Sequence, residues 1–196
     1  MVWICRHNDL ITMLDITLIW DCELLFEKLF VEHGLSYQRT PSSAIGTPFL
    51  PGSRVMIVPT GFANPQYTKI LRGIEANKSF FDGFVKKGGV LVVYGALVPE
   101  YTYRWLPFTL EYREQYGAVD IEAAGRADRG HECSCIFDGT RAECDGYFAG
   151  TDGDVILTGD GMPILVAKEH GDGIIVATTI HEFPTGEFLK WAVAYR

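Results

Sequence analysis

The first half of the chain alternates short apolar runs with longer amphipathic stretches. Residues 16–20, 54–58 and 90–94 are almost wholly apolar and rich in β-branched side chains. Such runs are typical of strands that are covered on both faces, because half-exposed strands alternate apolar with polar positions. A shorter strand is expected at 35–39, before a loop at 41–52. These runs predict the strands of a buried sheet.

The stretches between these runs have the spacing of helices. Asp21 is expected to cap a helix that ends at Gly34. Apolar positions at 67–74 and at 81–85 form two further helical stripes with a break near Asn77, and Gly88 ends the second. Strands that alternate with helices predict an α/β fold, a three-layer sandwich of the flavodoxin-like or amidotransferase-like kind with a doubly wound, mainly parallel sheet.

The pattern changes between about residues 98 and 154. Alternating stretches at 118–122 and 133–137, together with Pro, Gly and aromatic residues, predict an antiparallel, β-rich insertion. Strands at 155–157, 164–167 and 173–179 then complete the sheet, with turns at 159–161 and 171–173. A last helix is expected from Gly186 to about Tyr195, capped by Thr185. We expect a single domain over residues 1–196 that contains this insertion.

Composition narrows the class of protein. A chain of 196 residues that is 47% hydrophobic can bury one sizeable core. Its 17 basic residues are scattered among 25 acidic ones, which argues against nucleic acid as a partner. The apolar runs are far shorter than the roughly 18–20 residues that cross a bilayer, so we expect no membrane span. The first fourteen residues lack the apolar core of a secretory signal, and the five cysteines have no disulfide-like spacing. A cytoplasmic location is expected.

Candidate site residues follow the predicted strands, because ligands of open parallel sheets bind at the carboxyl ends of the strands. Asp21, Cys22 and Glu23 follow the first strand, and His181 with Glu182 follows the last. Between them lie two loops, in which Gly61 allows backbone amides to converge on an anion or a carbonyl oxygen. The expected ligand-binding residues of these loops are Thr60, Gly61, Phe62, Gly95 and Ala96.

These segments together resemble the class I glutamine amidotransferase superfamily, in particular the branch that includes the amino-terminal region of biotin ligase. In that family a strand ends in Pro-Gly-Gly and supplies oxyanion-hole amides, and here Val58-Pro59-Thr60-Gly61 stands in that place. A helix, Gly-Gly, a strand and G-x-C-x-G follow, and here Gly88-Gly89 matches while Gly95 takes the place of the Cys. His181-Glu182 resembles the family's His and Glu, without the usual spacer. The resemblance covers roughly residues 15–97 and 162–195.

The resemblance implies a protein without glutaminase activity, because Gly95 offers no nucleophile for a thioester. We expect binding of a small ligand or a protein partner at the carboxyl edge of the sheet, with no cofactor. The alternative is a hydrolase or transferase in which His181 and Glu182 act with water or Cys22. For Cys22 a buried position at a helix start is favoured over catalysis, and for Asp21 and Glu23 helix-capping charges are favoured. For His181 a role in the site and a hydrogen bond within its loop both stay open.

Two further clusters have alternative interpretations. His131, Cys133, Cys135 and Cys144 could close a tetrahedral metal site if alternate strand positions share a face. Their spacing lacks the paired C-x-x-C of zinc ribbons, so ordinary strand positions are favoured and no metal is expected. An aromatic cluster follows the third buried strand, and core packing is favoured over a pocket wall or the interface of a homodimer. Its members are Tyr101, Tyr103, Trp105 and Phe108.

Overall fold

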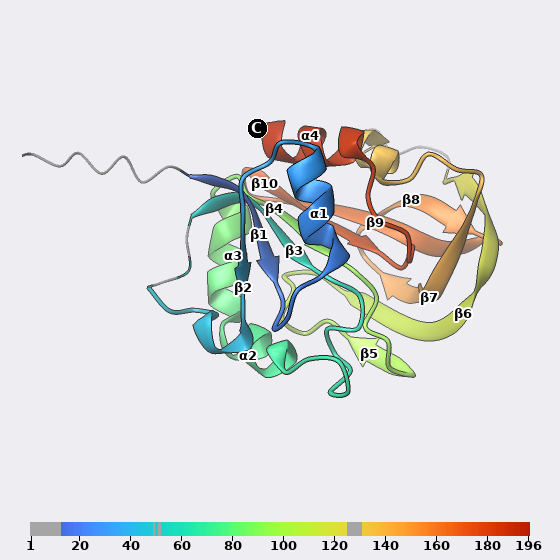
Figure 1. The fold of residues 1–196 in the computed structure, drawn as a ribbon. Helices are drawn as coiled ribbons and strands as arrows, with labels where there is room; N and C mark the ends of the chain where they lie inside the picture. Colours follow the sequence, from blue (N-terminus) through green and yellow to red (C-terminus); the bar gives the residue numbers. More distant parts are fainter. Residues whose placement is uncertain (1–12, 49, 51, 125–130) are drawn as a thin grey trace, which may run out of the picture.

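The computed structural model describes residues 13–48, 50, 52–124 and 131–196 (Figure 1). One half of its sheet is parallel, in the order β2-β1-β3-β4-β10. The strands are β1 (Leu14–Ile19), β2 (Tyr37–Thr40), β3 (Ser53–Val58), β4 (Val90–Val93) and β10 (Gly173–Thr178). Every residue of β4 and β10 is buried, as their apolar runs predict.

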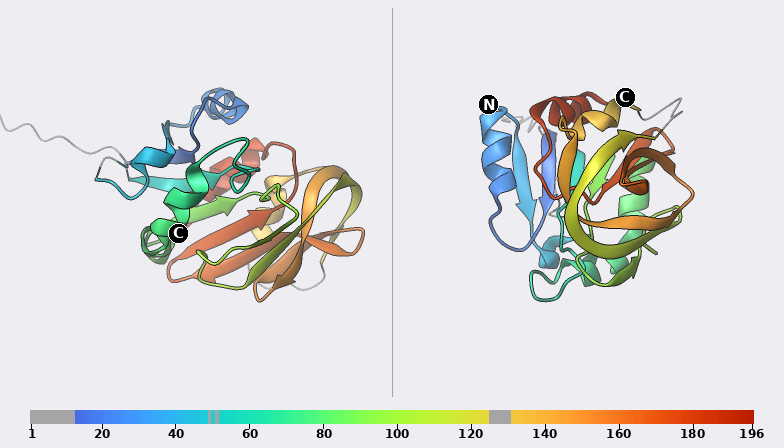
Figure 2. Two further views of the ribbon diagram at one scale, coloured as in Figure 1. Left: turned by 90° about the horizontal axis from the view of Figure 1, so that it is seen from below. Right: turned by 90° about the vertical axis from the view of Figure 1, so that its right-hand side faces the viewer.

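Helices cover both faces of this parallel half. They are α1 (Leu25–Glu32), α2 (Ile70–Ala76), α3 (Lys78–Lys86) and α4 (Gly186–Ala194), with a short 3-10 helix, η1 (Ser42–Ala44). The left view of Figure 2 shows α1 and α3 on opposite sides of the strands. The expected break near Asn77 is confirmed, since Asn77 stands between α2 and α3 and its Nδ2 donates to the carbonyl of Gly73 at 2.9 Å.

The start of α1 differs from the prediction. The helix begins at Leu25, and its N-cap is Leu24, whose N–H donates to Glu27 Oε1 at 3.2 Å. Asp21 therefore does not cap α1. Its carboxylate instead accepts hydrogen bonds from the loops that follow β2 and precede α2, and these tertiary partners prevail over the local cap.

The other half of the sheet is antiparallel, so the sheet is mixed rather than mainly parallel. Its strands are β5 (Glu100–Thr102), β6 (Leu110–Ala123), β7 (Arg141–Thr151), β8 (Asp154–Gly159) and β9 (Met162–His170). The order continues from β10 through β9, β8 and β6 to β5, and β7 pairs with β6. The right view of Figure 2 shows β6, in yellow-green, curving around this half. Residues 98–154 contribute β5, β6 and β7, and whether they are an insertion into an older fold stays a prediction.

The prediction of a strand at 133–137 is wrong. Residues His131–Ile136 form a 3-10 helix, η2, that packs against α4. Cys133 and Ile136 are both buried, and residues three apart lie on one face of a 3-10 helix. Trp191 Nε1 donates to Glu132 Oε2 at 2.9 Å, and Thr185 N donates to the carbonyl of Ile136 at 3.1 Å. The apolar positions of this segment therefore serve helix packing.

The aromatic cluster lies in the core, as favoured. Tyr103, Trp105 and Phe108 are buried, and the rings of Tyr101, Tyr103 and Trp105 each contact Phe62. The Trp105 ring also contacts Phe81 of α3, at 5.5 Å between centroids. This packing joins β5 and its flanking loops to the parallel half of the sheet.

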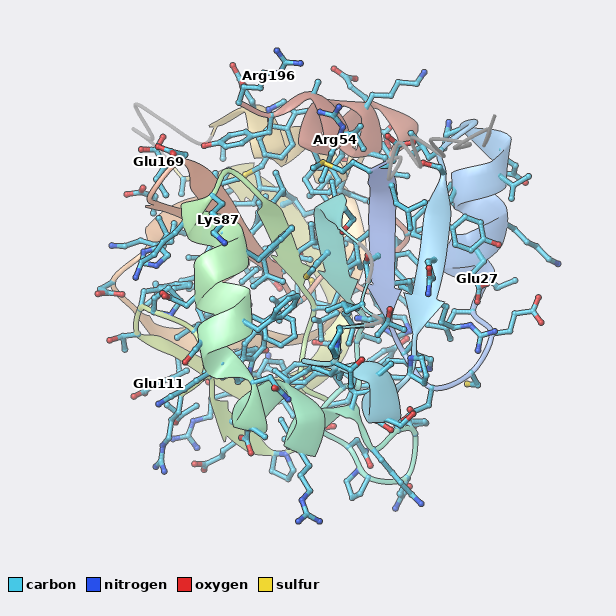
Figure 3. All side chains as sticks on the ribbon, turned by 90° about the vertical axis from the view of Figure 1, so that its left-hand side faces the viewer. Glu27, Arg54, Lys87, Glu111, Glu169 and Arg196 are labelled. Atoms are coloured by element: carbon cyan, nitrogen blue, oxygen red, sulfur yellow. The ribbon has the colours of Figure 1, made fainter. Side chains whose placement is uncertain are left out.

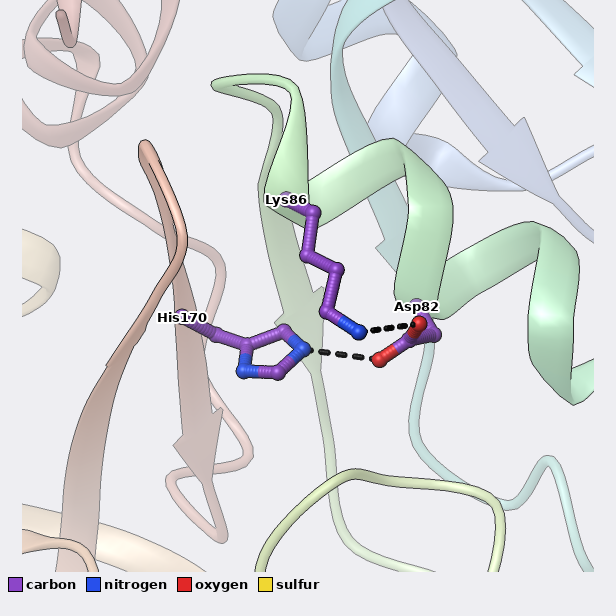
Figure 4. A network of polar contacts seen from close by, with 3 residues as sticks. All are labelled: Asp82, Lys86 and His170. Atoms are coloured by element: carbon purple, nitrogen blue, oxygen red, sulfur yellow. Dashed lines mark hydrogen bonds and ion pairs between the residues drawn. The ribbon is translucent and has the colours of Figure 1, made fainter.

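A polar network ties α3 to the end of β9 (Figure 4). Asp82 accepts a hydrogen bond from Lys86 Nζ at 2.9 Å, and His170 Nε2 lies 2.7 Å from the other carboxylate oxygen. Hydrogen bonds from Lys86 and then His170 lower the pKa of Asp82.

None of the helices in the described ranges is long and apolar enough to cross a bilayer.

Candidate functional site

The carboxyl ends of β3 and β4 bring two predicted site loops into contact. Gly61 N donates to the carbonyl of Gly95 at 2.9 Å, and Thr60 Oγ1 lies 3.3 Å from the same oxygen. The sequence placed these residues at one edge, and the structure brings them together. The Gly61 amide, which the resemblance would assign to an oxyanion hole, is already satisfied by a carbonyl group of the protein.

A buried carboxyl group lies directly beside Gly95. Asp145 of β7 is fully buried, and its carboxylate contacts the hydroxyl of Thr60 and lies 3.2 Å from the hydroxyl of Tyr112. A Cβ atom placed on Gly95 would stand 2.0 Å from Asp145 Oδ1. The Asp145 side chain therefore occupies the space that a side chain at position 95 would need.

The surroundings of Asp145 change its acidity. Burial raises its pKa to about 6, although hydrogen bonds from Thr60 and Tyr112 and the nearby His181 act in the opposite direction. A carboxyl group with this pKa changes its charge close to neutral pH. Asp145 is therefore a buried group at this edge of the sheet that can change its protonation state.

Asp145 reaches the site because β7 pairs with the segment that follows β10. Asp145 N donates to the carbonyl of Thr179 at 2.9 Å, and His181 N donates to the carbonyl of Glu143 at 2.8 Å. Cys144 and Ile180 form an isolated bridge between these hydrogen bonds. The pairing places Asp145 inside the protein and His181 at its surface. Sequence reasoning missed Asp145, because this pairing joins distant segments.

His181 belongs to an exposed polar group. Its ring meets that of Tyr116 edge-on, with 6.1 Å between centroids, and Tyr116 is 63% exposed. The Tyr116 hydroxyl contacts the Glu143 carboxylate, which raises the pKa of the tyrosine. Glu182 Oε1 accepts a hydrogen bond from Glu143 N at 2.8 Å. The predicted pair is therefore joined to two residues that sequence reasoning missed, Tyr116 and Glu143.

The remaining predicted residues lie apart from this exposed group. Cys22 is exposed in the turn after β1, so the favoured buried position is wrong, and within the described ranges no contact joins it to His181. Phe62 and Ala96 are fully buried, and Phe62 is part of the aromatic core. Neither presents its side chain to solvent.

Asp21 has a structural role at the end of β1. Its carboxylate accepts hydrogen bonds from Ser42 N at 2.8 Å, Lys69 N at 2.8 Å and Thr68 Oγ1 at 2.6 Å. Burial by itself would raise the pKa of Asp21, but these hydrogen bonds outweigh it and lower the pKa to about 2. The residue holds three loops together as a carboxylate.

The cysteines considered as metal ligands do not share one face of a strand. Cys133 and Cys135 lie in η2 and Cys144 lies in β7, so they do not alternate along one strand. Burial raises the pKa of Cys133 and of Cys144 to about 12, which opposes the thiolate form that binds metals. In the described part of the chain, no group of three His, Cys, Asp or Glu side chains is arranged to hold a metal. The side chain of His131 lies outside the described residues.

A non-glycine residue in a left-handed conformation follows Gly95. Leu97 has φ of 51°, and its carbonyl accepts a hydrogen bond from Asn64 Nδ2 at 3.0 Å. Such a conformation is unfavourable for a branched side chain and is retained only where its surroundings impose it. The segment after β4 therefore has a strained backbone at Leu97, two residues after Gly95.

Comparison with known proteins finds similar folds among solved structures. No family model and no curated protein matches the chain. Among solved structures, a cytoplasmic protein from Salmonella typhimurium is similar, with a TM-score of 0.53, 14% identity, and coverage of 91% of this chain and 97% of that one. A ThuA-like protein from Bacteroides uniformis has a TM-score of 0.51 and 11% identity over 92% of this chain and 89% of that one.

A glutamine amidotransferase from Thermotoga maritima is also similar. It has a TM-score of 0.50 and 13% identity, with coverage of 86% of this chain and 75% of that chain. At these identities the likeness concerns the fold alone. The chain thus shares an α/β fold with a glutamine amidotransferase and a ThuA-like protein, which confirms the α/β class expected from its sequence.

Proposed function

We propose that this chain is an amidotransferase-like protein that does not hydrolyse glutamine and that binds a small ligand or a protein partner at the carboxyl edge of its sheet. The observation that carries the proposal is Asp145, whose buried carboxyl group fills the space beside Gly95. A thiol on Gly95 would need the volume that this carboxyl group occupies. The fold shared with an amidotransferase is therefore combined with a site built differently.

The resemblance assigns the nucleophile position to Gly95, which has no side chain. Residues 94–99 contain no cysteine, serine or threonine, so the neighbouring positions of this turn offer no nucleophile either.

The amide of Gly61 supports the same conclusion. An oxyanion hole requires N–H groups that point at the developing charge of the substrate. Gly61 N instead donates to the carbonyl of Gly95 at 2.9 Å. Its donor would have to break a hydrogen bond within the protein before it could stabilise an oxyanion.

The exposed polar group is the proposed recognition surface. Tyr116, Glu143 and His181 offer an aromatic ring, a carboxylate and an imidazole on neighbouring segments. Glu182 Oε1 accepts a hydrogen bond from the backbone of β7, and within the described residues no hydrogen bond joins Glu182 to His181. This arrangement favours binding over the alternative of hydrolysis by His181 and Glu182.

The glutaminase prediction is tested by ammonia release. Purified protein incubated with glutamine is expected to release no more ammonia than buffer, and His181→Ala and Cys22→Ser are expected to give the same result. The measurement is a coupled assay for ammonia, with an active glutamine amidotransferase as positive control. Release that continues over many turnovers and is abolished by His181→Ala would show that a catalytic site remains.

A further inference from the structure

Two adjoining cavities open between α3 and the amino-terminal end of β3, at the opposite end of the parallel strands from Asp145. One has a volume of about 540 Å³ and the other about 310 Å³. Ser53, Phe84 and Lys87 line both, so the two cavities adjoin each other beside α3, and we refer to them together as the double cavity. None of these three residues belongs to the carboxyl-edge site.

Positive charge gathers at one end of this double cavity. Arg54, Lys87 and Arg196 line the larger cavity, and Figure 3 shows all three at the same end of α3 and β3. Within the described residues none of the three makes an ion pair. Asp172 is the acidic side chain of this lining, so the balance is positive. This local excess of cations contrasts with the net charge of −8 of the whole chain.

The other end of the double cavity is apolar. Leu50, Met56, Phe80 and Phe84 line the smaller cavity together with Gly83. A glycine inside a helix lowers the stability of that helix, and close packing is a common reason for its presence. That reason is absent at Gly83, because a Cβ atom there would meet no atom within 4 Å. The missing side chain instead leaves room in the cavity.

We propose that the double cavity binds a small amphipathic anion. The apolar chain or ring of such a ligand would lie along α3 beside Gly83, and its carboxylate, phosphate or sulfonate would lie among Arg54, Lys87 and Arg196. Apolar walls with a few convergent charged groups are the usual composition of small-molecule sites. Guanidinium and ammonium groups form strong charge-assisted hydrogen bonds with such anions.

Titration calorimetry with octanoate, octyl phosphate and octylamine tests the proposal. The two anions are expected to bind with a Kd of about 1 mM or lower, which is modest for a small ligand. Octylamine has the same tail and the opposite charge, and is expected not to bind. Equal binding of all three compounds, or binding of none, would overturn the proposal.

Variants locate the binding. Lys87→Ala and Arg54→Ala are expected to weaken octanoate binding about tenfold each, because each removes a charged hydrogen-bond donor. Lys28→Ala, an equal change of charge at an exposed position of α1, is the matched control and should leave the Kd unchanged. Equal weakening by Lys28→Ala would show a general charge effect and contradict the site.

Gly83 tests the apolar end. Gly83→Leu is expected to abolish octanoate binding by filling the cavity, while Gly83→Ala adds one methyl group and should retain most of it. Melting curves must show that both variants are folded, and leucine is compatible with a helix at this open position. Unchanged binding in a folded Gly83→Leu protein would refute the placement of the tail. The result is independent of the carboxyl-edge proposal, because His181→Ala should not affect it.

Discussion

At the scale of single residues, the glycine at position 95 and the buried position of the Asp145 carboxyl group depend on each other. The absence of a side chain at position 95 leaves space for a carboxyl group, and two hydroxyl groups hold that carboxyl group in place. Three of the residues involved, Thr60, Gly61 and Gly95, could be placed at one edge from the sequence, because each follows an apolar run. Asp145 could not, since nothing in a single sequence shows that an acidic residue between Cys144 and Gly146 is buried.

The first prediction concerns the fit between Gly95 and Asp145. Gly95→Ala is expected to lower the free energy of unfolding by about 2 kcal/mol, because the added Cβ overlaps the carboxyl group. In the Asp145→Ala background the same change should cost at least about 1 kcal/mol less, since contacting sites couple. Urea unfolding of the four proteins gives the coupling. Gly117→Ala is the control, because a Cβ there meets no atom within 4 Å. Equal costs in both backgrounds would contradict the overlap.

The second prediction concerns pH. The folded-state pKa of Asp145 is about 6 against an ordinary value of 3.8, so the folded protein holds this proton more tightly than the unfolded chain does. Below about pH 4 both states are protonated and the full stability is present. As the pH rises from about 4 through 6, the free energy of unfolding falls by up to about 3 kcal/mol. This value corresponds to the difference of about two units between the two pKa values of Asp145. Asp145 therefore makes the protein less stable at pH 7 than at pH 4.

Asp145→Asn isolates this effect, because an amide oxygen can still accept hydrogen bonds from Thr60 and Tyr112. The difference in unfolding free energy between the variant and the natural protein should grow in favour of the variant between pH 4 and pH 7. Denaturant unfolding at several pH values measures it. A difference that stays constant over this interval would mean that Asp145 titrates normally. Subtracting the two proteins also removes the opposite contribution of Asp21, whose low pKa costs stability only as the pH falls below about 4.

At the scale of elements, the sequence predicted strands and helix caps correctly where no distant residue bonded to the segment in another way. Apolar runs became β1, β3 and β4 with ends that differ by one or two residues. Asp21 was misassigned as a helix cap, because its three hydrogen-bond donors come from distant loops. The segment 133–137 was misassigned as a strand, because a few apolar positions in a short segment fit both a strand and a 3-10 helix.

The cap of α4 yields the third prediction. Thr185 Oγ1 accepts a hydrogen bond from Phe188 N at 3.1 Å, as the sequence predicts, and also contacts the carbonyl of Cys135 in η2. Thr185→Ala is expected to lower the free energy of unfolding by about 1 kcal/mol or slightly more. Thr185→Ser retains the hydroxyl and should lose much less. Thermal unfolding followed by circular dichroism compares the variants, and equal losses would assign the effect to the methyl group rather than to the cap.

At the scale of the whole molecule, the sequence predicted the class of the fold and an antiparallel segment, but not that the antiparallel strands make up half of one mixed sheet. Alternation of strands and helices indicated parallel pairing for β2, β1, β3 and β4, which the structure confirms. The antiparallel half depends on which distant strands meet, as where β6 joins both β7 and β8. A local pattern carries no information about those partners. Homodimer formation stays a prediction, but Trp105 is buried and is not available to mediate it.

The position of β10 between β4 and β9 has a consequence for how the chain folds. Val90 of β4 pairs with Ile174 of β10, so the strand that completes the parallel half is synthesised long after β4. Until then, the fully apolar β4 has an open edge to which another unfinished chain can add. Pairing over such a sequence separation is slow, because a long loop must close before the contact forms. This protein should therefore depend on chaperones during synthesis more than its size suggests.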